Sequence, residues 1–188
     1  MSDLVRLAVV GAGLIGKRHI DAIGRSRRTA CAAVVEPNPV TGLDAPIFPS
    51  LTEMLRHERP DGVILSTPTP LHAQGAIEAL QAGLPVLIEK PLTATLEEAR
   101  HVTEVAEATG IPVLVGHHRR HNPLILAAQE ALKTGCIGQI RAVQATCWFY
   151  KPDAYFDEAP WRKTSGGGPI SVNLVHDIER NARKLVMP

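Results

Sequence analysis

Three glycines near the N-terminus, Gly11, Gly13 and Gly16, follow the spacing G-x-G-x-x-G. In this spacing the first glycine permits a tight turn, the second lets the backbone approach a pyrophosphate, and the third lets a helix pack closely on a strand. An apolar run, residues 4–10, precedes them, and a segment with helical periodicity follows. Together these features predict a binding site for the phosphates of a dinucleotide at a helix N-terminus. A purely structural turn is the alternative.

Glu36 lies about 20 residues after the last of these glycines, where an acidic side chain would accept hydrogen bonds from a ribose 2′-OH. Pro37, Asn38 and Pro39 follow it, so no nearby arginine or lysine could receive a 2′-phosphate. The pattern favours NAD over NADP. A solvated glutamate at the end of a strand is the alternative interpretation.

Lys90 is a candidate for proton chemistry, because it follows an apolar run expected to be a parallel strand, and open α/β sheets bind ligands at the carboxyl ends of their strands. Taken alone, it could equally be a surface lysine before a proline. His117, His118 and His121 have no neighbouring carboxylate or cysteine, and no metal site is predicted there. Arg119 and Arg120 would suit a carboxylated substrate or would orient the cofactor side of the cleft.

The elements expected to position these residues alternate between strand and helix. Capping boxes, Ser50 with Glu53 and Thr95 with Glu98, mark two helix starts. The predicted strands are residues 4–10, 30–36, 62–66, 86–89 and 112–116, and the helices between them end near Arg25, Ala82 and Gly110. Leu14, Ile15 and Ile23 are expected to face the sheet. This alternation predicts an α/β fold, a Rossmann-type doubly wound parallel sheet.

The character of the sequence changes after His121, so the chain is divided into a dinucleotide-binding domain at 1–121 and a second part at 122–188. In the second part a helix is predicted over 123–133 and a long strand over 139–150. Gly166, Gly167 and Gly168 then precede a last predicted helix. A strand without neighbours would leave an open edge, so self-association is expected there.

Composition narrows the function classes. Hydrophobic residues make up 45% and charged residues 21%, and the formal net charge is +1, so nothing favours nucleic acid or an anionic membrane. Three separated cysteines without a CxxC pair suit a reducing, cytoplasmic compartment. Asp3 argues against a signal peptide, and no apolar run is long enough to span a membrane.

Five segments together resemble the glucose-fructose oxidoreductase and inositol dehydrogenase family (Gfo/Idh/MocA): GAGLIGKRH, STPTPLHA, EKP, the pair WR, and GGGPISVNLVHDIE. Their order and spacing cover the chain to about Glu179. The resemblance implies an NAD(P)-dependent dehydrogenase that acts on sugars, inositols or related hydroxy compounds. It also implies a second α/β domain that carries the substrate site and the oligomer contacts, of which residues 122–188 would be the N-terminal, incomplete part.

The resemblance assigns roles to individual residues. Thr67, Pro68, Leu71 and His72 correspond to the loop beside the adenosine ribose and the pyrophosphate. Glu89 and Lys90 correspond to residues near the nicotinamide ribose, and His176 to the histidine that exchanges the substrate proton. The expected catalytic pair is therefore Lys90 with His176. The expected NAD-contacting residues are Gly11, Gly13, Leu14, Ile15, Gly16, Glu36, Thr67, Pro68, Leu71, His72, Glu89, Lys90, Trp161 and Arg162.

One position departs from the family. Val172 stands where an aspartate is common, one helical turn before His176, and Asn173 beside it cannot act as a base. The chain is also shorter than the family's usual length. Two function classes therefore stay open, a dehydrogenase and a catalytically impaired NAD-binding fragment that lacks most of the substrate domain. NAD-dependent glycoside cleavage, known on similar scaffolds, is a third possibility, and the substrate cannot be read from the sequence.

Overall fold

The computed structural model describes residues 4–136, 138–142, 144, 146, 148, 150–164 and 168. The chain divides into two compact units, Met1–Gly116 and His117–Pro188, and each is described by itself. The expected final helix, with Val172 and His176, lies outside the described residues. No helix in the described part is both long and apolar enough to cross a bilayer.

The first unit is built on a parallel sheet whose strand order, within the described residues, is β3-β2-β1-β4-β5-β6. The predicted Rossmann architecture is confirmed. The short strand β3 was not predicted from the sequence. The strands are β1 (Val5–Val10), β2 (Thr29–Val35), β3 (Ile47–Phe48), β4 (Gly62–Leu65), β5 (Val86–Glu89) and β6 (Val113–Gly116). The helices between them are α1 (Leu14–Arg25), α2 (Leu51–His57), the 3-10 helix Thr69–Leu71, α3 (His72–Gln81) and α4 (Leu96–Thr109).

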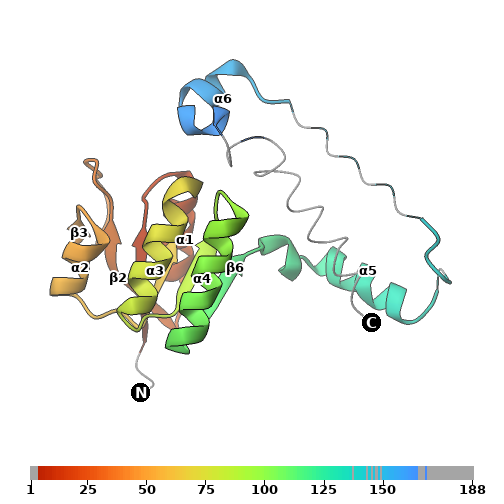
Figure 1. Ribbon diagram of the computed structural model, residues 1–188, viewed down its shortest axis with the longest axis horizontal. Helices are drawn as coiled ribbons and strands as arrows, with labels where there is room; N and C mark the ends of the chain where they lie inside the picture. Colours follow the sequence, from red (N-terminus) through yellow and green to blue (C-terminus); the bar gives the residue numbers. More distant parts are fainter. Residues whose placement is uncertain are drawn as a thin grey trace. The chain divides into compact units, whose positions relative to one another are not determined.

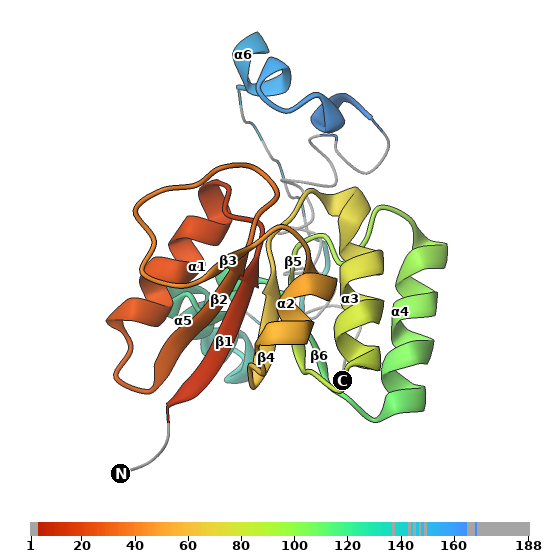
Figure 2. The same cartoon turned by 90° about the vertical axis from the view of Figure 1, so that its left-hand side faces the viewer.

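The helices cover the sheet from both sides, with α1 on one face and α2, α3 and α4 on the other (Figures 1 and 2). Alternate residues of each strand point to opposite faces, so one strand serves two cores. Val9 and Ile64 pack with Ile23 of α1, whereas Val10 and Leu65 belong to the larger cluster on the opposite face. That larger cluster also contains Leu51, Met54, Ala73, Ala76, Leu80 and Val102 from the helices.

Two expectations for α1 differ from the structure. Ile23 is buried, as predicted, but Leu14 is 71% exposed and Ile15 is 37% exposed, so neither packs against the sheet. Both lie in the first turn of α1, which begins only four residues after β1 ends. This first turn extends past the end of the strands, where no sheet surface lies beneath it. The hydrophobic periodicity correctly identified the helix but not the end of the sheet.

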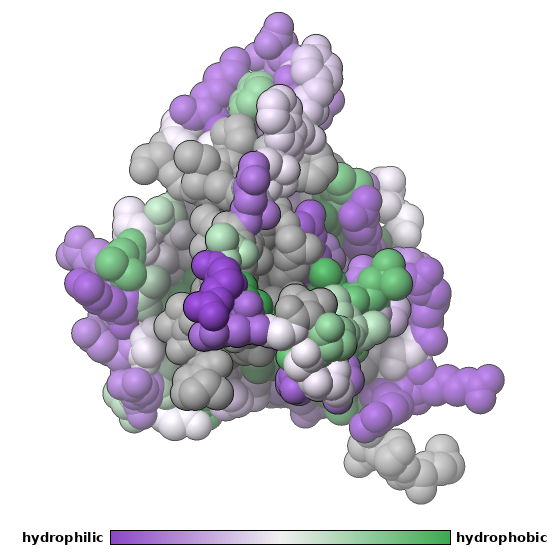
Figure 3. Space-filling model, turned by 90° about the vertical axis from the view of Figure 1, so that its right-hand side faces the viewer, coloured by the Kyte–Doolittle hydropathy of each residue, from purple (hydrophilic) through white to green (hydrophobic). Residues whose placement is uncertain are grey.

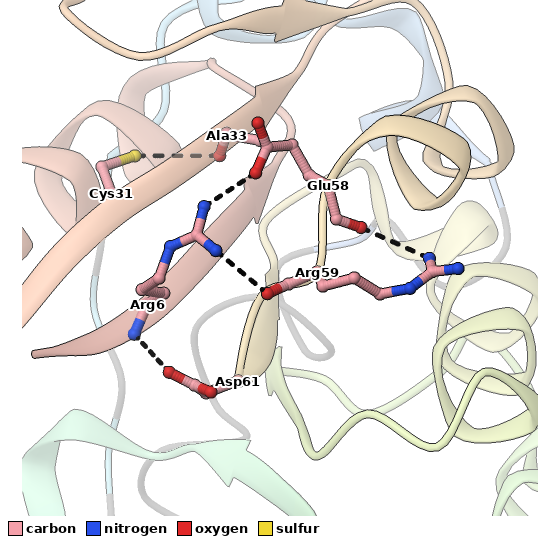
Figure 4. A network of polar contacts seen from close by, with 6 residues as sticks. All are labelled: Arg6, Cys31, Ala33, Glu58, Arg59 and Asp61. Carbon is pink, nitrogen blue, oxygen red and sulfur yellow. Dashed lines mark hydrogen bonds and ion pairs between the residues drawn. The ribbon is translucent and has the colours of Figure 1, made fainter. Parts of the chain in front are cut away.

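A polar network fixes the opposite end of the sheet, at the start of β1 (Figure 4). The Arg6 guanidinium donates to a Glu58 carboxylate oxygen at 2.7 Å and to the Arg59 carbonyl at 3.3 Å. The backbone N–H of Arg6 donates to Asp61 Oδ2 at 2.7 Å. These bonds join β1 to the loop that leads into β4. Cys31 is a separate case, with its thiol 3.7 Å from the Ala33 carbonyl.

The second unit contains α5 (Pro123–Lys133), α6 (Asp153–Asp157) and two 3-10 helices, His118–His121 and Pro160–Lys163. The Asn122 side chain caps α5, accepting from the backbone N–H of Leu124 at 2.9 Å. Large hydrophobic side chains of this unit are exposed, among them Leu124 at 78% and Trp148 at 88%. On the face drawn in Figure 3, hydrophobic patches lie between hydrophilic ones.

The long strand expected over 139–150 is absent from the described residues of that range, which form no strand. An extended segment becomes a strand only by pairing with a neighbour. The alternation of apolar residues indicates a face suited to a sheet, but it does not supply the partner. Within the described part of this unit no such partner strand is present.

Candidate functional site: a dinucleotide site at the carboxyl edge of the sheet

The segments that follow β1, β2 and β4 are hydrogen-bonded to one another at one edge of the sheet. The backbone N–H of Gly11 donates to the Val35 carbonyl at 2.8 Å, and that of Ser66 donates to the Val10 carbonyl at 2.8 Å. The Ser66 hydroxyl then donates to the Gly11 carbonyl at 2.9 Å. The glycine turn is therefore held from both sides before any ligand binds.

The three glycines have different surroundings. Gly11 has a φ of +91°, and a Cβ there would lie 2.9 Å from the Ser66 backbone. A Cβ on Gly16 would lie 1.8 Å from the Gly11 carbonyl oxygen, so only glycine allows α1 to pack here. Gly13 has no atom within 4 Å of where its Cβ would be. Space is thus left open beside Gly13, at the N-terminus of α1.

Glu36 lies at the end of β2 and reaches back to the glycine turn. Its Oε2 accepts from the backbone N–H of Ala12 at 2.9 Å. Its Oε1 accepts from the backbone N–H of Asn38 at 3.1 Å and from the Asn38 side-chain amide at 2.9 Å. Partial burial acts to raise the pKa of Glu36, but these hydrogen bonds outweigh it and hold the pKa below its usual range. The carboxylate is therefore ionised and oriented beside the turn.

Thr67 and His72 flank the loop that follows β4. The Thr67 hydroxyl oxygen is buried and has no hydrogen-bond partner in the described structure. His72 is 1% exposed, with Nδ1 2.9 Å from the Pro91 carbonyl and Nε2 2.9 Å from the Thr67 carbonyl. Both of its ring nitrogens thus face the backbone. Between them, Thr69 is buried, while Leu71 is 50% exposed.

Glu89, the last residue of β5, forms an ion pair with His19 of α1, with 2.9 Å between Oε1 and Nε2. Its Oε2 accepts from the backbone N–H of Lys90 at 3.3 Å. Burial acts to raise the pKa of Glu89, but the hydrogen bond and charge of His19, together with the charge and backbone N–H of Lys90, lower it further than burial raises it. Glu89 is therefore held as a carboxylate next to Lys90.

His19 is a residue of the candidate site that the sequence analysis did not single out. A signal was available in the spacing. His19 follows Gly16 by three residues, which places both on one face of α1. Gly16 is the residue at which α1 approaches the sheet, so His19 had to face the ends of the strands. Only the strand order could have identified Glu89 as its partner.

The remaining predicted residues belong to the second unit or lie outside the described residues. Arg162 lies over the Tyr155 ring, with 3.9 Å between its guanidinium carbon and the ring centroid, and it also donates to the Tyr155 carbonyl. Trp161 precedes it in the same 3-10 helix. The structure brings these predicted residues to the carboxyl ends of the first unit's strands, in the loops there and in the adjoining ends of α1, α3 and β5: Gly11, Gly13, Gly16, Glu36, Thr67, Pro68, His72, Glu89 and Lys90. The pairing of Lys90 with His176 stays a prediction.

The residues of this edge fit a dinucleotide. Gly13, the N-cap of α1, has no side-chain cap hydrogen bond, and no acidic residue lies in the first helical turn. The N–H groups and the positive end of the helix dipole therefore suit a pyrophosphate, in the space that a side chain at Gly13 would fill. The buried Thr67 hydroxyl supplies a hydrogen-bonding group that no atom of the described residues satisfies.

Residues 5–117 match the family described as "Oxidoreductase family, NAD-binding Rossmann fold" (GFO_IDH_MocA). The rhizopine catabolism protein MocA of Rhizobium meliloti is 30% identical over 184 residues, which cover 93% of this chain and 55% of that protein. An inositol 2-dehydrogenase of Corynebacterium glutamicum is 32% identical over 149 residues, covering 74% of this chain and 44% of that protein.

The crystal structure of the WlbA dehydrogenase from Bordetella pertussis, in complex with NADH and UDP-GlcNAcA, superimposes with a TM-score of 0.93 at 29% identity. The match covers 100% of this chain and 57% of that one. The chain therefore spans about half the length of the curated relatives it matches. With its first unit matched from β1 through β6, the chain belongs to the Gfo/Idh/MocA family of oxidoreductases.

Proposed function

We propose that this chain binds NAD at the carboxyl edge of its sheet, as part of an oxidoreductase that acts on a sugar, an inositol or a related hydroxy compound. One observation carries the proposal. The ionised Glu36 carboxylate lies hydrogen-bonded beside the open space at Gly13, at the uncapped N-terminus of α1. A ribose diol can donate to that carboxylate, while the adjacent helix end accepts the phosphates.

The preference for NAD over NADP follows from the charge of Glu36. Its carboxylate accepts hydrogen bonds from a ribose diol but repels a 2′-phosphate. The pKa of Glu36 is already held low by Ala12 and Asn38, so the negative charge persists at neutral pH. The neighbouring Asn38 is uncharged and its amide donates to Glu36, so it adds no cation for a phosphate.

The chemistry would divide between the bound cofactor and side chains of this chain. NAD supplies the hydride acceptor when an alcohol is oxidised. The alcohol carbon loses a hydride while its hydroxyl loses a proton, which yields a carbonyl compound, NADH and one proton. Lys90, at the end of β5, would hold the oxygen and stabilise the charge that develops on it. The family resemblance offers His176 as the group that takes the proton.

Glu89 supports the role of Lys90, because its carboxylate is a partly buried negative charge next to that lysine. The relatives support the proposed substrate class, because they include inositol 2-dehydrogenases and a 1,5-anhydro-D-fructose reductase. We also propose a cytoplasmic location, which suits the free thiols of Cys31 and Cys136.

A second candidate is an NAD-binding chain that does not turn over. One observation favours it: Val172 stands where an aspartate is common in the family. A valine side chain can neither accept a proton nor stabilise a protonated histidine by its charge, so proton transfer at His176 would be impaired.

Titration of the purified 188-residue chain with NADH, followed by addition of NAD and a panel of polyols, tests both candidates. If the chain binds NADH and also reduces NAD to NADH when a polyol is added, the dehydrogenase is supported. If it binds NADH but reduces no NAD with any polyol, the second candidate is supported. Gly13→Ala should abolish binding, because its methyl group would occupy the phosphate space. Gly24→Ala, on the same helix and with nothing within 4 Å of its Cβ, is the matched control. Absence of NADH binding to the unaltered chain would refute the proposal.

A further inference from the structure

His72 makes contacts that no cofactor-binding role explains. It is the first residue of α3, and only 1% of its surface is exposed. Its Nδ1 lies 2.9 Å from the Pro91 carbonyl oxygen and its Nε2 lies 2.9 Å from the Thr67 carbonyl oxygen. With both ring nitrogens directed at the backbone and almost no exposed surface, His72 has no polar atom left for a nucleotide.

The two carbonyl groups belong to different loops of the candidate site. Thr67 lies two residues after β4, and Pro91 lies two residues after β5. These strands are direct neighbours, with Leu65 paired to Ile88, so the loops leave the sheet side by side. The imidazole ring of His72 therefore bridges the loop that carries Thr67 and the turn that carries Lys90.

The turn after β5 depends on this bridge for its position. Pro91 has no N–H of its own, so its carbonyl is the polar backbone group through which the residue can be held. A partly buried carbonyl left without a donor is costly, so an N–H on Nδ1 would make the histidine contact stabilising. Lys90 immediately precedes Pro91, and its own backbone N–H donates to Glu89. The backbone on both sides of the Lys90 side chain is thus fixed, by Glu89 before it and by His72 after it.

We infer that His72 is a positioning residue that holds Lys90 at the nicotinamide end of the site, and not a residue that contacts the cofactor. This inference rests on the proposed binding of NAD. Imidazole fits between the two carbonyl groups because its two nitrogens lie on opposite sides of a rigid ring; a neutral ring donates to one carbonyl and an imidazolium to both. A glutamine amide carries both of its N–H donors on one nitrogen, so it cannot reach carbonyl groups that lie on opposite sides of the ring.

The test compares NADH with ADP-ribose, which lacks the nicotinamide, as calorimetric ligands of the full 188-residue chain. His72→Gln should weaken NADH binding about tenfold and leave ADP-ribose binding within about twofold. His101→Gln, on the exposed surface of α4, is the matched control and should change neither affinity. Equal weakening of both ligands by His72→Gln would indicate a general structural role and would overturn the inference.

A double-mutant cycle asks whether His72 acts through Lys90. Lys90→Met alone should weaken NADH binding, and adding His72→Gln should cause no further loss, because the positioned group is gone. Additive losses would overturn the inference. If the unaltered chain binds neither ligand, the proposed function fails instead, and the two failures are distinguishable.

A measurement on the unaltered chain covers the case in which His72→Gln does not fold. Without cofactor, a ring N–H of His72 should give a slowly exchanging NMR signal, because the residue is 1% exposed and both ring nitrogens lie 2.9 Å from backbone carbonyl oxygens. Rapid exchange of the ring N–H with solvent would show that the bridge does not hold and would overturn the inference.

Discussion

His19 of α1 and Glu89 of β5 form an ion pair with 2.9 Å between Nε2 and Oε1, and their side chains are only 23% and 15% exposed. The pair links the helix that begins at the glycine turn to the strand that ends at Lys90. Two parts of the candidate site that lie 70 residues apart in sequence are thereby joined through side chains.

The first prediction concerns the pH dependence of stability. Because the folded chain holds the pKa of Glu89 below its usual value, folding favours the ionised form. This contribution is present above the unfolded-state pKa of about 4.3 and is lost as the pH falls through the lower folded pKa. Glu89→Gln should therefore flatten the decline in the free energy of unfolding between neutral and acidic pH, measured by urea denaturation. Glu97→Gln, an exposed glutamate of α4, is the control for removal of one carboxylate.

The second prediction separates the stability roles of two glycines in one helix. Gly16→Ala should destabilise the fold by about 3 kcal/mol, because its methyl group overlaps the Gly11 carbonyl oxygen. Gly24→Ala has open space and should stabilise α1 by up to about 1 kcal/mol. Chemical denaturation of both variants measures the difference. Similar stabilities for the two would contradict the geometry.

The third prediction is that one substitution at Thr67 stabilises the fold and weakens NADH binding. Thr67→Val removes a buried hydroxyl without a partner and keeps the shape of the side chain, so the free energy of unfolding should rise by about 1 kcal/mol. The same change removes the group proposed to meet the cofactor, so NADH affinity should fall. Thermal denaturation and NADH titration of one sample measure both. A variant that loses stability would indicate an unseen partner for the hydroxyl.

The fourth prediction concerns the two residues that set the charge of the ribose site. Asn38→Ala removes the side-chain donor 2.9 Å from Glu36 Oε1. One of the hydrogen bonds that oppose the effect of burial is then lost, so the pKa of Glu36 should rise. A carboxyl-carbon NMR titration measures the pKa of Glu36 in both proteins. A pKa that does not rise in the variant would show that the Asn38 amide does not donate to Glu36.

Glu36→Ala should narrow the preference for NADH over NADPH by roughly 1–3 kcal/mol. Tighter binding of NADPH than NADH by the unaltered chain would contradict the assignment.

The fifth prediction tests the network at the amino end of the sheet. Asp61→Ala leaves the Arg6 backbone N–H without its 2.7 Å acceptor and should cost about 1 kcal/mol of stability. Asp21→Ala, which breaks only the exposed pair with Arg25 on α1, should cost no more than about 0.5 kcal/mol. Equal losses would mean that the network contributes no more than a surface ion pair.

Much of the first unit was predictable because its signals are local. Hydrophobic runs located the strands to within about one or two residues, and the capping box of Thr95 and Glu98 is complete in the structure. At the other predicted box Ser50 does accept from the Glu53 N–H, but the Glu53 carboxylate bonds Arg56 and His57. When a glutamate has several possible partners nearby, the sequence does not show which of them its carboxylate contacts.

The contacts that define the site were less predictable because they join distant segments. The bridge from His72 to Pro91 and the pair of His19 with Glu89 both require the strand order, which periodicity does not give. The described residues of 139–150 form no strand for the opposite reason, since the pattern suits a sheet but the described part of the second unit offers no strand to pair with. Features that depend on neighbouring residues could be predicted from the sequence, whereas contacts between distant segments could not.

The position of β1 in the sheet also constrains how a nascent chain can fold. Although β1 is made first, it lies between β2 and β4, and Leu7 pairs with Gly62, so both of its neighbours emerge from the ribosome later. Until β4 is available, the apolar run Val5–Val10 has one open edge. Such long-range pairing slows folding and lengthens the time for which that edge can meet other chains. Slowing synthesis just before residue 62 should therefore increase aggregation more than slowing it after residue 89.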